Sequence, residues 1–201
     1  VESDDWAEPT MFAELTKLAE DNQAQAVKSD FYFYVSRSGG SNTKCNLMDP
    51  SEIGTIVTPC QTPYIFNCMA SIWSGLYLKQ FLVDNKIDFL PTPGASYQDT
   101  GFNFKVWTMA DRAVYTTNAY LHYRIDNETS SVKSRAKVFC VCDEFDSIKQ
   151  YLIDHDRMDQ LKSVYTWRKY DIYRWNQGRL DGQNLRDFTE RMAEEFRQDQ
   201  S

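Results

Sequence analysis

The spacing of apolar and polar residues divides the first half of the chain into helical and extended segments. Residues 10–27 carry apolar side chains three and four positions apart, which predicts an amphipathic helix. Residues 30–36 are apolar on both faces and rich in β-formers, which is typical of a central strand. A turn-rich loop is predicted at 37–52 and a short strand at 53–57. Residues 63–83 form the most apolar helical candidate.

The second half begins with extended patterns and ends with helical ones. A loop is predicted at 91–101, and strands are predicted at 102–109, 113–125 and 132–142. A short polar turn joins the last two strands, which indicates a hairpin. The pattern then becomes helical from Asp143 to about residue 175, with a final helix at 184–200. Because the strands cluster and do not alternate with helices, the predicted fold class is α+β, with a mostly antiparallel sheet packed by helices. We expect an α+β domain at 1–178 and a docking helix at 179–201.

Composition supports a folded chain and argues against some functions. The 201 residues are 42% hydrophobic and 14% aromatic, enough to build a core. The net charge is −7, which argues against general binding to nucleic acid or anionic membranes but allows a local basic patch. No apolar run approaches the roughly 18–20 residues that span a bilayer.

The cysteines do not resemble a disulfide framework or a zinc site. They are odd in number and lack paired C-x-x-C elements, and the chain has only two histidines. We therefore expect no metal or other cofactor, and a reducing, intracellular compartment or a particle assembled there. The cysteines are Cys45, Cys60, Cys68, Cys140 and Cys142.

The stretch NCMASIWSGL at 67–76 raises the question of a catalytic thiol. If Asn67 caps a helix, Cys68 lies in its first turn, where the helix dipole lowers the pKa of the thiol. His122 would then be the base, with Asp126 or Asn118 orienting it.

The alternative for Cys68 is a structural one. Thr62 and Pro63 provide a more complete helix start, which places Cys68 in the second turn among apolar residues. A free cysteine in that position behaves as a small buried hydrophobe.

The predicted hairpin places basic and aromatic side chains on one face of residues 120–137. Cross-strand neighbours lie within roughly 5 Å, so like charges there favour an anion, a nucleic acid or an acidic partner. The alternative is a solvated face whose cations pair with the chain's own carboxylates. The residues of this face are Tyr120, His122, Arg124, Lys133, Arg135 and Lys137.

The final helix carries a narrow apolar stripe on an otherwise polar surface. Such a stripe docks onto another subunit or onto the chain's own domain, and the sequence leaves both alternatives open. The stripe consists of Leu185, Phe188, Met192 and Phe196.

These patterns lead to three functional hypotheses, and no motif ties the chain to a known family. The leading one is a non-enzymatic structural or interaction protein that assembles with copies of itself or with other subunits, as in a viral or phage particle. The second is a cysteine-dependent hydrolase that uses Cys68, His122 and Asp126. The third is a nucleic-acid or anion-binding module that uses the basic hairpin at 120–137.

Overall fold

The computed structural model describes residues 4–49, 51, 55–91, 97–126 and 137–199. The chain forms two compact units. The first, here called the sheet unit, comprises residues 1–88 and 102–129, and the second, the helical unit, comprises residues 89–101 and 130–201. The final helix therefore groups with the helices before it, and the boundary differs from the one predicted at residue 178.

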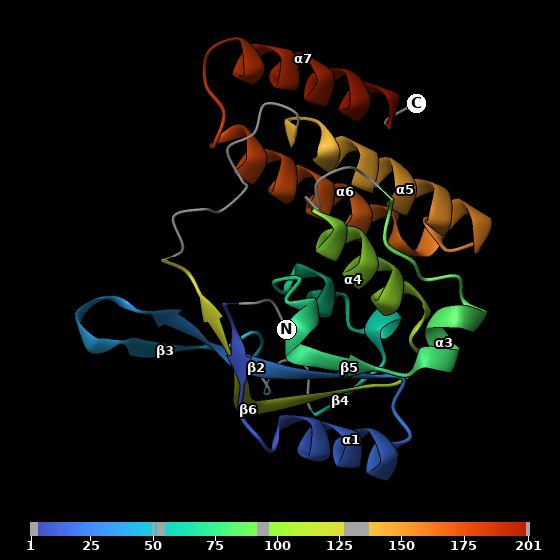
Figure 1. Ribbon diagram of the computed structural model, residues 1–201. Coiled ribbons are helices and arrows are strands. Elements are labelled where there is room, and N and C mark those ends of the chain that lie inside the picture. The colour runs from blue at the N-terminus through green and yellow to red at the C-terminus, as the bar shows by residue number, and fades with distance from the viewer. Residues whose placement is uncertain (1–3, 50, 52–54, 92–96, 127–136, 200–201) are drawn as a thin grey trace. The chain divides into compact units, whose positions relative to one another are not determined.

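One sheet of six strands organises the sheet unit (Figure 1). Its main path runs β1-β6-β2-β3, with β4 paired to β6 and β5 paired to β2. The two longest strands, β2 and β6, are parallel, and every other pairing is antiparallel. The α+β class is confirmed, but the prediction of a mostly antiparallel sheet is wrong because its central pair is parallel. The strands are β1 (Trp6–Ala7), β2 (Ala26–Val35), β3 (Ser41–Cys45), β4 (Ile56–Val57), β5 (Gly75–Tyr77) and β6 (Ala113–Arg124).

Helix α1 (Met11–Asn22) covers one face of this sheet (Figure 1). Its apolar stripe is buried because Met11 and Leu15 face the sheet, as the three-to-four spacing predicts. The helix ends at Gln23, which adopts the left-handed conformation at φ 51° and lets the chain turn into β2. The core around α1 contains Met11, Leu15, Ala24, Val27, Phe31, Val114, Tyr120 and Leu121.

Two predicted segments of the sheet unit have different structures. Residues 63–83 are not one helix: two 3₁₀ turns, strand β5 and the short helix α3 (Lys79–Asp84) share this stretch. Gly75 lets β5 pair with β2, since a side chain there would approach the Val27 carbonyl oxygen to 2.5 Å. Residues 102–109 are helical and belong to α4 (Gln98–Met109), which is buried nearly all round over these residues and so lacks the amphipathic pattern of a surface helix.

The helical unit contains α5 (Cys140–Asp154), α6 (Met158–Gln177) and α7 (Gly182–Gln198). The predicted strand at 132–142 is wrong where it can be checked: residues 127–136 lie outside the described ranges, and α5 begins at Cys140. Val141, Phe145 and Ile148 recur at helical spacing and are fully buried, so burial of one helical face favours a helix over a strand in this segment. No helix among the described residues is long and apolar enough to cross a membrane.

Candidate functional site

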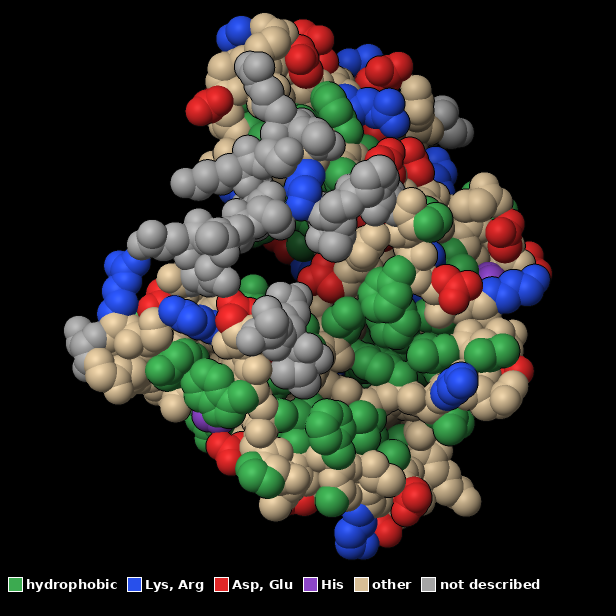
Figure 2. Space-filling model, in the orientation of Figure 1, with side chains coloured by type: hydrophobic (Ala, Val, Ile, Leu, Met, Phe, Trp, Pro, Cys, Tyr) green, Lys and Arg blue, Asp and Glu red, His purple; other side chains and the backbone are tan. Residues whose placement is uncertain are grey.

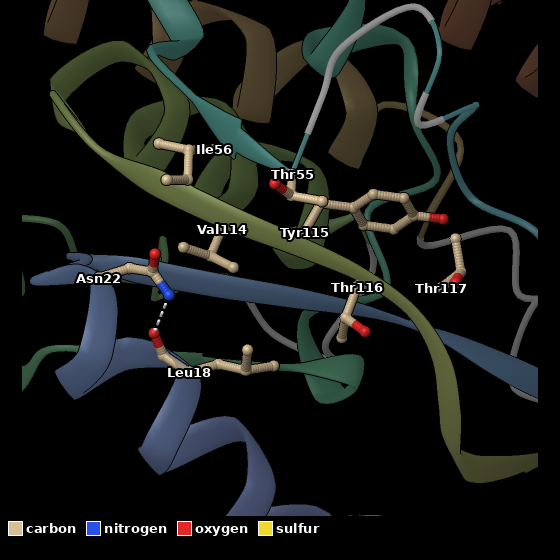
Figure 3. Close-up of a pocket in the computed structure, with 8 residues that line it drawn as sticks. All are labelled: Leu18, Asn22, Thr55, Ile56, Val114, Tyr115, Thr116 and Thr117. Carbon is tan, nitrogen blue, oxygen red and sulfur yellow. Dashed lines mark hydrogen bonds between the residues drawn. The ribbon is translucent and has the colours of Figure 1, made fainter.

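A pocket of about 360 Å³ lies beside β6 in the sheet unit (Figure 3). Its floor is apolar or hydroxylic, and its lining carries no acidic or basic side chain. The hydroxyl of Tyr115 lies 2.5 Å from Asp30 Oδ1 and 3.1 Å from the Met48 carbonyl oxygen. The pocket is therefore poorly suited to phosphate. It is lined by Leu18, Asn22, Thr55, Ile56, Val114, Tyr115, Thr116 and Thr117.

A charged cluster lies at the opposite end of β6, where parallel β2 and β6 both reach their carboxyl ends. Arg124 donates from Nε to Asp126 Oδ1 at 3.0 Å and from Nη2 to Ser36 Oγ at 2.9 Å. Ser36 donates its hydroxyl and its backbone N–H to Asp126 Oδ2 at 2.8 and 2.9 Å. The hydrogen bonds from Ser36, followed by that from Arg124, lower the pKa of Asp126 to about 2. Asp126 thus stays ionised and holds Arg124.

A second carboxylate joins this cluster from the residues just before β1. Asp5 Oδ1 accepts the backbone N–H of Arg124 at 2.9 Å. Asp5 Oδ2 is buried and has no hydrogen-bond partner within the described part of the chain. Burial raises the pKa of Asp5, and the neighbouring charge of Asp4 adds to the rise. We call Asp5, Ser36, Arg124 and Asp126 the carboxyl-edge cluster.

An aromatic stack borders the carboxyl-edge cluster. The imidazole of His122 lies between the rings of Trp6 and Tyr32, with centroid distances of 4.5 and 4.8 Å. Its Nδ1 lies 2.7 Å from Asn42 Oδ1 and its Nε2 lies 2.9 Å from Glu8 Oε1. His122 is buried, whereas Trp6 is 40% exposed. The stack therefore presents a rigid indole to solvent.

These contacts contradict the cysteine-hydrolase site. Cys68 is an extended residue after a 3₁₀ turn, at φ −69° and ψ 152°, so no helix dipole acts on its thiol. Both ring nitrogens of His122 are engaged by Asn42 and Glu8. Asp126 binds Ser36 and Arg124, and does not orient His122.

Asn118, the alternative orienting residue, also does not serve His122. Its amide donates to the hydroxyl of Tyr120 at 3.1 Å. The predicted triad is thus not assembled.

The structure describes four of the six residues of the predicted basic face. Tyr120 is buried, and its hydroxyl donates to Glu14 at 2.6 Å. Lys133 and Arg135 lie outside the described residues, and Lys137 precedes α5 in the helical unit. The face was predicted from a hairpin partner that is helical from residue 140 onward.

The apolar stripe of α7 contacts its own unit. Phe188 is fully buried, with its ring centroid 5.5 Å from that of Tyr173 on α6. Phe196 lies 6.0 Å from the same ring. Leu185 and Met192 are half-buried. The stripe therefore docks within the chain, as the second of the two sequence alternatives states.

A further feature lies where the predicted loop at 91–101 enters α4. Tyr97 has a φ of +64°, in the left-handed region. Within the described ranges, three further non-glycine residues have a positive φ, and all of them follow the ends of helices, where this conformation is common: Gln23, Lys86 and Asp156. Tyr97 instead precedes a helix, and the first turn of that helix carries the exposed carboxylate of Asp99. Strained residues of this kind cluster at functional sites.

Sequence reasoning singled out Arg124 and Asp126 but not the cluster that they form with Asp5 and Ser36. The parallel pairing of β2 and β6, which creates the edge, depends on contacts between residues about ninety positions apart. Among the described residues, no three His, Cys, Asp or Glu side chains are grouped to hold a metal ion.

Comparison with known proteins identifies the fold. No family model matches the chain, and no curated protein matches it. Among solved structures, S. aureus TarS residues 1–349 in complex with UDP-GlcNAc matches with a TM-score of 0.58 and 15% identity, over 81% of this chain and 48% of that one. The same TarS segment in complex with UDP matches with a TM-score of 0.52 and 16% identity, over 76% of this chain and 39% of that one. The chain thus spans less than half the length of these TarS chains.

This likeness corrects the leading hypothesis. The chain shares its fold with TarS, a protein whose structures hold UDP-GlcNAc and UDP. The expectation of a non-enzymatic structural protein, including a viral or phage particle component, is therefore wrong. The narrow stripe that suggested assembly is accounted for by the packing of α7 inside the helical unit.

Proposed function

We propose that the chain is part of a glycosyltransferase that moves a sugar from a nucleotide-sugar donor to an acceptor hydroxyl. The observation that carries this proposal is the likeness, with TM-scores of 0.58 and 0.52, to TarS bound to UDP-GlcNAc and to UDP. Because the chain spans less than half of TarS, the donor and the acceptor of the complete protein are both part of the proposal.

The carboxyl-edge cluster supports a role in donor binding. In open sheets with parallel strands, ligands bind outside the carboxyl ends of those strands. Arg124 lies at this edge with 36% of its side chain exposed, and a guanidinium suits the phosphates of a nucleotide-sugar. The exposed indole of Trp6, held flat on His122, suits stacking on the base or the sugar.

The reaction also needs a general base that accepts the proton of the acceptor hydroxyl. Asp126 is poorly suited to this role, because Ser36 and Arg124 already hold its carboxylate. In the proposed step, the base takes the proton of the acceptor hydroxyl while that oxygen bonds to the anomeric carbon. The bond from this carbon to the diphosphate oxygen breaks, and the nucleoside diphosphate leaves with the bonding electrons.

The test combines donor binding with turnover. UDP-GlcNAc is titrated into the 201-residue chain, and UDP release is followed with water and with a panel of sugar and polyol acceptors. We expect Arg124→Gln to weaken the binding of UDP-GlcNAc about tenfold or more, because it removes the guanidinium of the carboxyl-edge cluster. The matched control is Arg112→Gln, an exposed arginine of the same unit. Absence of binding at millimolar UDP-GlcNAc would contradict the proposed function, and unchanged binding by Arg124→Gln would contradict the role of Arg124.

A further inference from the structure

Three flat rings lie nearly parallel across neighbouring strands of the sheet unit. Trp6 on β1 and Tyr32 on β2 are both register partners of His122 on β6. The Trp6 indole makes an angle of 7° with the imidazole, and the Tyr32 ring makes an angle of 19° with it. Directly opposite residues of paired strands point to the same side of the sheet, so these three side chains form one ring stack.

The middle ring of the stack is fixed by hydrogen bonds. His122 is 6% exposed, and its two nitrogens lie 2.7 Å from Asn42 Oδ1 and 2.9 Å from Glu8 Oε1. Asn42 lies on β3 and Glu8 follows β1, so the imidazole is held from both sides of β6. Rotation of the ring about χ2 would break both bonds. The face that His122 offers to Trp6 is therefore rigid.

Trp6 itself is held by its neighbours in the sheet. Asp5, the residue before it, accepts the backbone N–H of Arg124 on β6 at 2.9 Å. The ring of Tyr34 on β2 stands nearly perpendicular to the indole, at 80°, with the two centroids 4.5 Å apart. The exposed 40% of Trp6 thus belongs to the part of a fixed indole that neither His122 nor Tyr34 covers.

Arg124 lies beside the ring stack on the same side of the sheet. It follows His122 by two positions on β6, and alternate residues of a strand point to the same side with Cα atoms roughly 7 Å apart. In a nucleotide-sugar, one ribose joins the base to the diphosphate. A base can therefore lie against the Trp6 indole while the Arg124 guanidinium binds a phosphate. All of these residues belong to the sheet unit.

The flatness of the indole favours the base over the transferred sugar. The indole ends a stack of flat rings, and a base adds a further flat ring to it. Bases stack on aromatic side chains with substantial affinity, whatever the identity of the base. A pyranose ring is puckered and carries hydroxyl groups that the face of an indole leaves without hydrogen bonds.

We infer that the Trp6 indole stacks on the base of the nucleotide-sugar donor, and that His122 is a positioning residue that holds this indole in place. This inference rests on the proposed function, and it names the part of the donor that the indole contacts. Because the hydrogen bonds to Glu8 and Asn42 fix His122, they also contribute to donor binding without touching the donor.

The test of Trp6 compares three ligands of the 201-residue chain: UDP-GlcNAc, UDP and inorganic pyrophosphate, which has neither base nor sugar. We expect Trp6→Ala to weaken the binding of UDP and UDP-GlcNAc equally, by about 5- to 100-fold, because both lose the same stacked base. Binding of pyrophosphate should not change. Trp6→Phe keeps an aromatic ring and should restore most of the affinity. The matched control is Phe12→Ala, an exposed aromatic residue of α1 in the same unit, which should alter none of the three affinities.

The positioning role of His122 is tested with two substitutions. His122→Ala removes the middle ring, and we expect it to weaken UDP binding about 2- to 10-fold while pyrophosphate binding stays unchanged. His122→Phe keeps a flat ring beside the indole and should bind UDP more tightly than His122→Ala. A role confined to stability would weaken UDP and pyrophosphate binding alike.

The outcomes separate this inference from the proposed function. If wild type binds UDP and UDP-GlcNAc, and Trp6→Ala binds both as tightly, the inference is overturned and the proposed function stands. If Trp6→Ala loses affinity for UDP-GlcNAc alone, the indole contacts the sugar, and the assignment to the base is overturned. An equal loss of UDP and pyrophosphate binding in His122→Ala overturns the positioning role. If wild type binds neither UDP nor UDP-GlcNAc, the proposed function fails and the inference fails with it.

Discussion

Asp30 in the sheet unit and Lys169 in the helical unit are both buried ionisable side chains, and the groups that surround them differ. In the sheet unit, Asp30 on β2 is fully buried. Its Oδ1 accepts the Tyr115 hydroxyl at 2.5 Å and the Leu47 N–H at 2.9 Å. Lys44 approaches Oδ2 to 3.3 Å, but 41% of the Lys44 side chain is exposed. The hydrogen bonds to the Asp30 carboxylate therefore come from neutral donors.

The helical unit surrounds its buried charge with opposite charges. Lys169 on α6 is 1% exposed, and its Nζ lies 2.7 Å from Asp199 Oδ2 and 3.1 Å from Glu195 Oε2. The same ammonium lies over the ring of Tyr173, 5.5 Å from its centroid. Both carboxylates come from the end of α7 or just beyond it.

The difference shows how each unit depends on charge. An anion held by hydroxyl and backbone groups can lose its charge and keep its hydrogen bonds. A cation held by two carboxylates cannot, because the carboxylates would remain buried beside each other. The two units also differ on the surface that Figure 2 shows. Acidic and basic side chains are interspersed over the helices, whereas hydrophobic side chains gather over the sheet unit. Docking of α7 onto α6 therefore depends on electrostatics as well as on the apolar stripe.

Removing the buried cation should give the largest effect on stability. We expect Lys169→Met to lower the free energy of unfolding of the helical unit by about 3–5 kcal/mol, because Glu195 and Asp199 lose their shared partner. Urea denaturation followed by helical circular dichroism measures this change. The matched control is Lys162→Met on the exposed face of the same helix. A loss no larger than that of the control would show that the carboxylates do not depend on Lys169.

Neutralising the buried anion of the sheet unit should cost less. Asp30→Asn keeps an Oδ1 that can accept from Tyr115 and Leu47, and loses only the charged character of those bonds and the pair with Lys44. We expect a loss of about 1–2 kcal/mol in unfolding free energy, measured by urea denaturation with tyrosine fluorescence. Asp111→Asn, at an exposed position of the same unit, is the control. A loss equal to that of Lys169→Met would remove the distinction between the two units.

The sequence predicted elements well where one amphipathic period dominates. Strand β6 and helix α7 lie where their patterns place them, whereas helix α1 ends at Asn22, before the predicted end, because residues 26–27 belong to β2. The prediction failed at 102–109 because nearly uniform burial removes the amphipathic period in α4. It failed at 137–142 because Val138, Cys140 and Cys142 alternate as in a strand, although Cys140 and Cys142 lie in α5. It also missed β3, whose residues Ser41–Cys45 are mostly exposed and polar.

The candidate site was less predictable than the fold. His122 and Arg124 were singled out, but as part of a hairpin face, whereas β6 is a central strand with neighbours on both sides. His122 pairs with Glu8, 114 positions away in the sequence, and Arg124 donates to Ser36, 88 positions away. Such contacts follow from sheet order, which local patterning does not specify.

Acid should destabilise the helical unit, and this effect should be smaller than those of the two substitutions. Although burial raises the pKa of Glu195, hydrogen bonds from Tyr173, Arg191 and Lys169 lower it below its ordinary 4.5. A carboxyl with a lowered folded-state pKa contributes stability above its unfolded-state pKa, and this contribution is lost as the pH falls through the folded-state value.

The helical unit should therefore lose stability progressively below about pH 4.5. Urea midpoints at pH 6, 5, 4 and 3 test this, and Glu195→Gln should flatten the pH dependence of the helical signal. The exposed neighbour Glu194→Gln should leave it unchanged. Parallel pH profiles for wild type and Glu195→Gln would mean that Glu195 titrates alike in folded and unfolded chains. The buried charge network would then contribute nothing to the acid sensitivity of this unit.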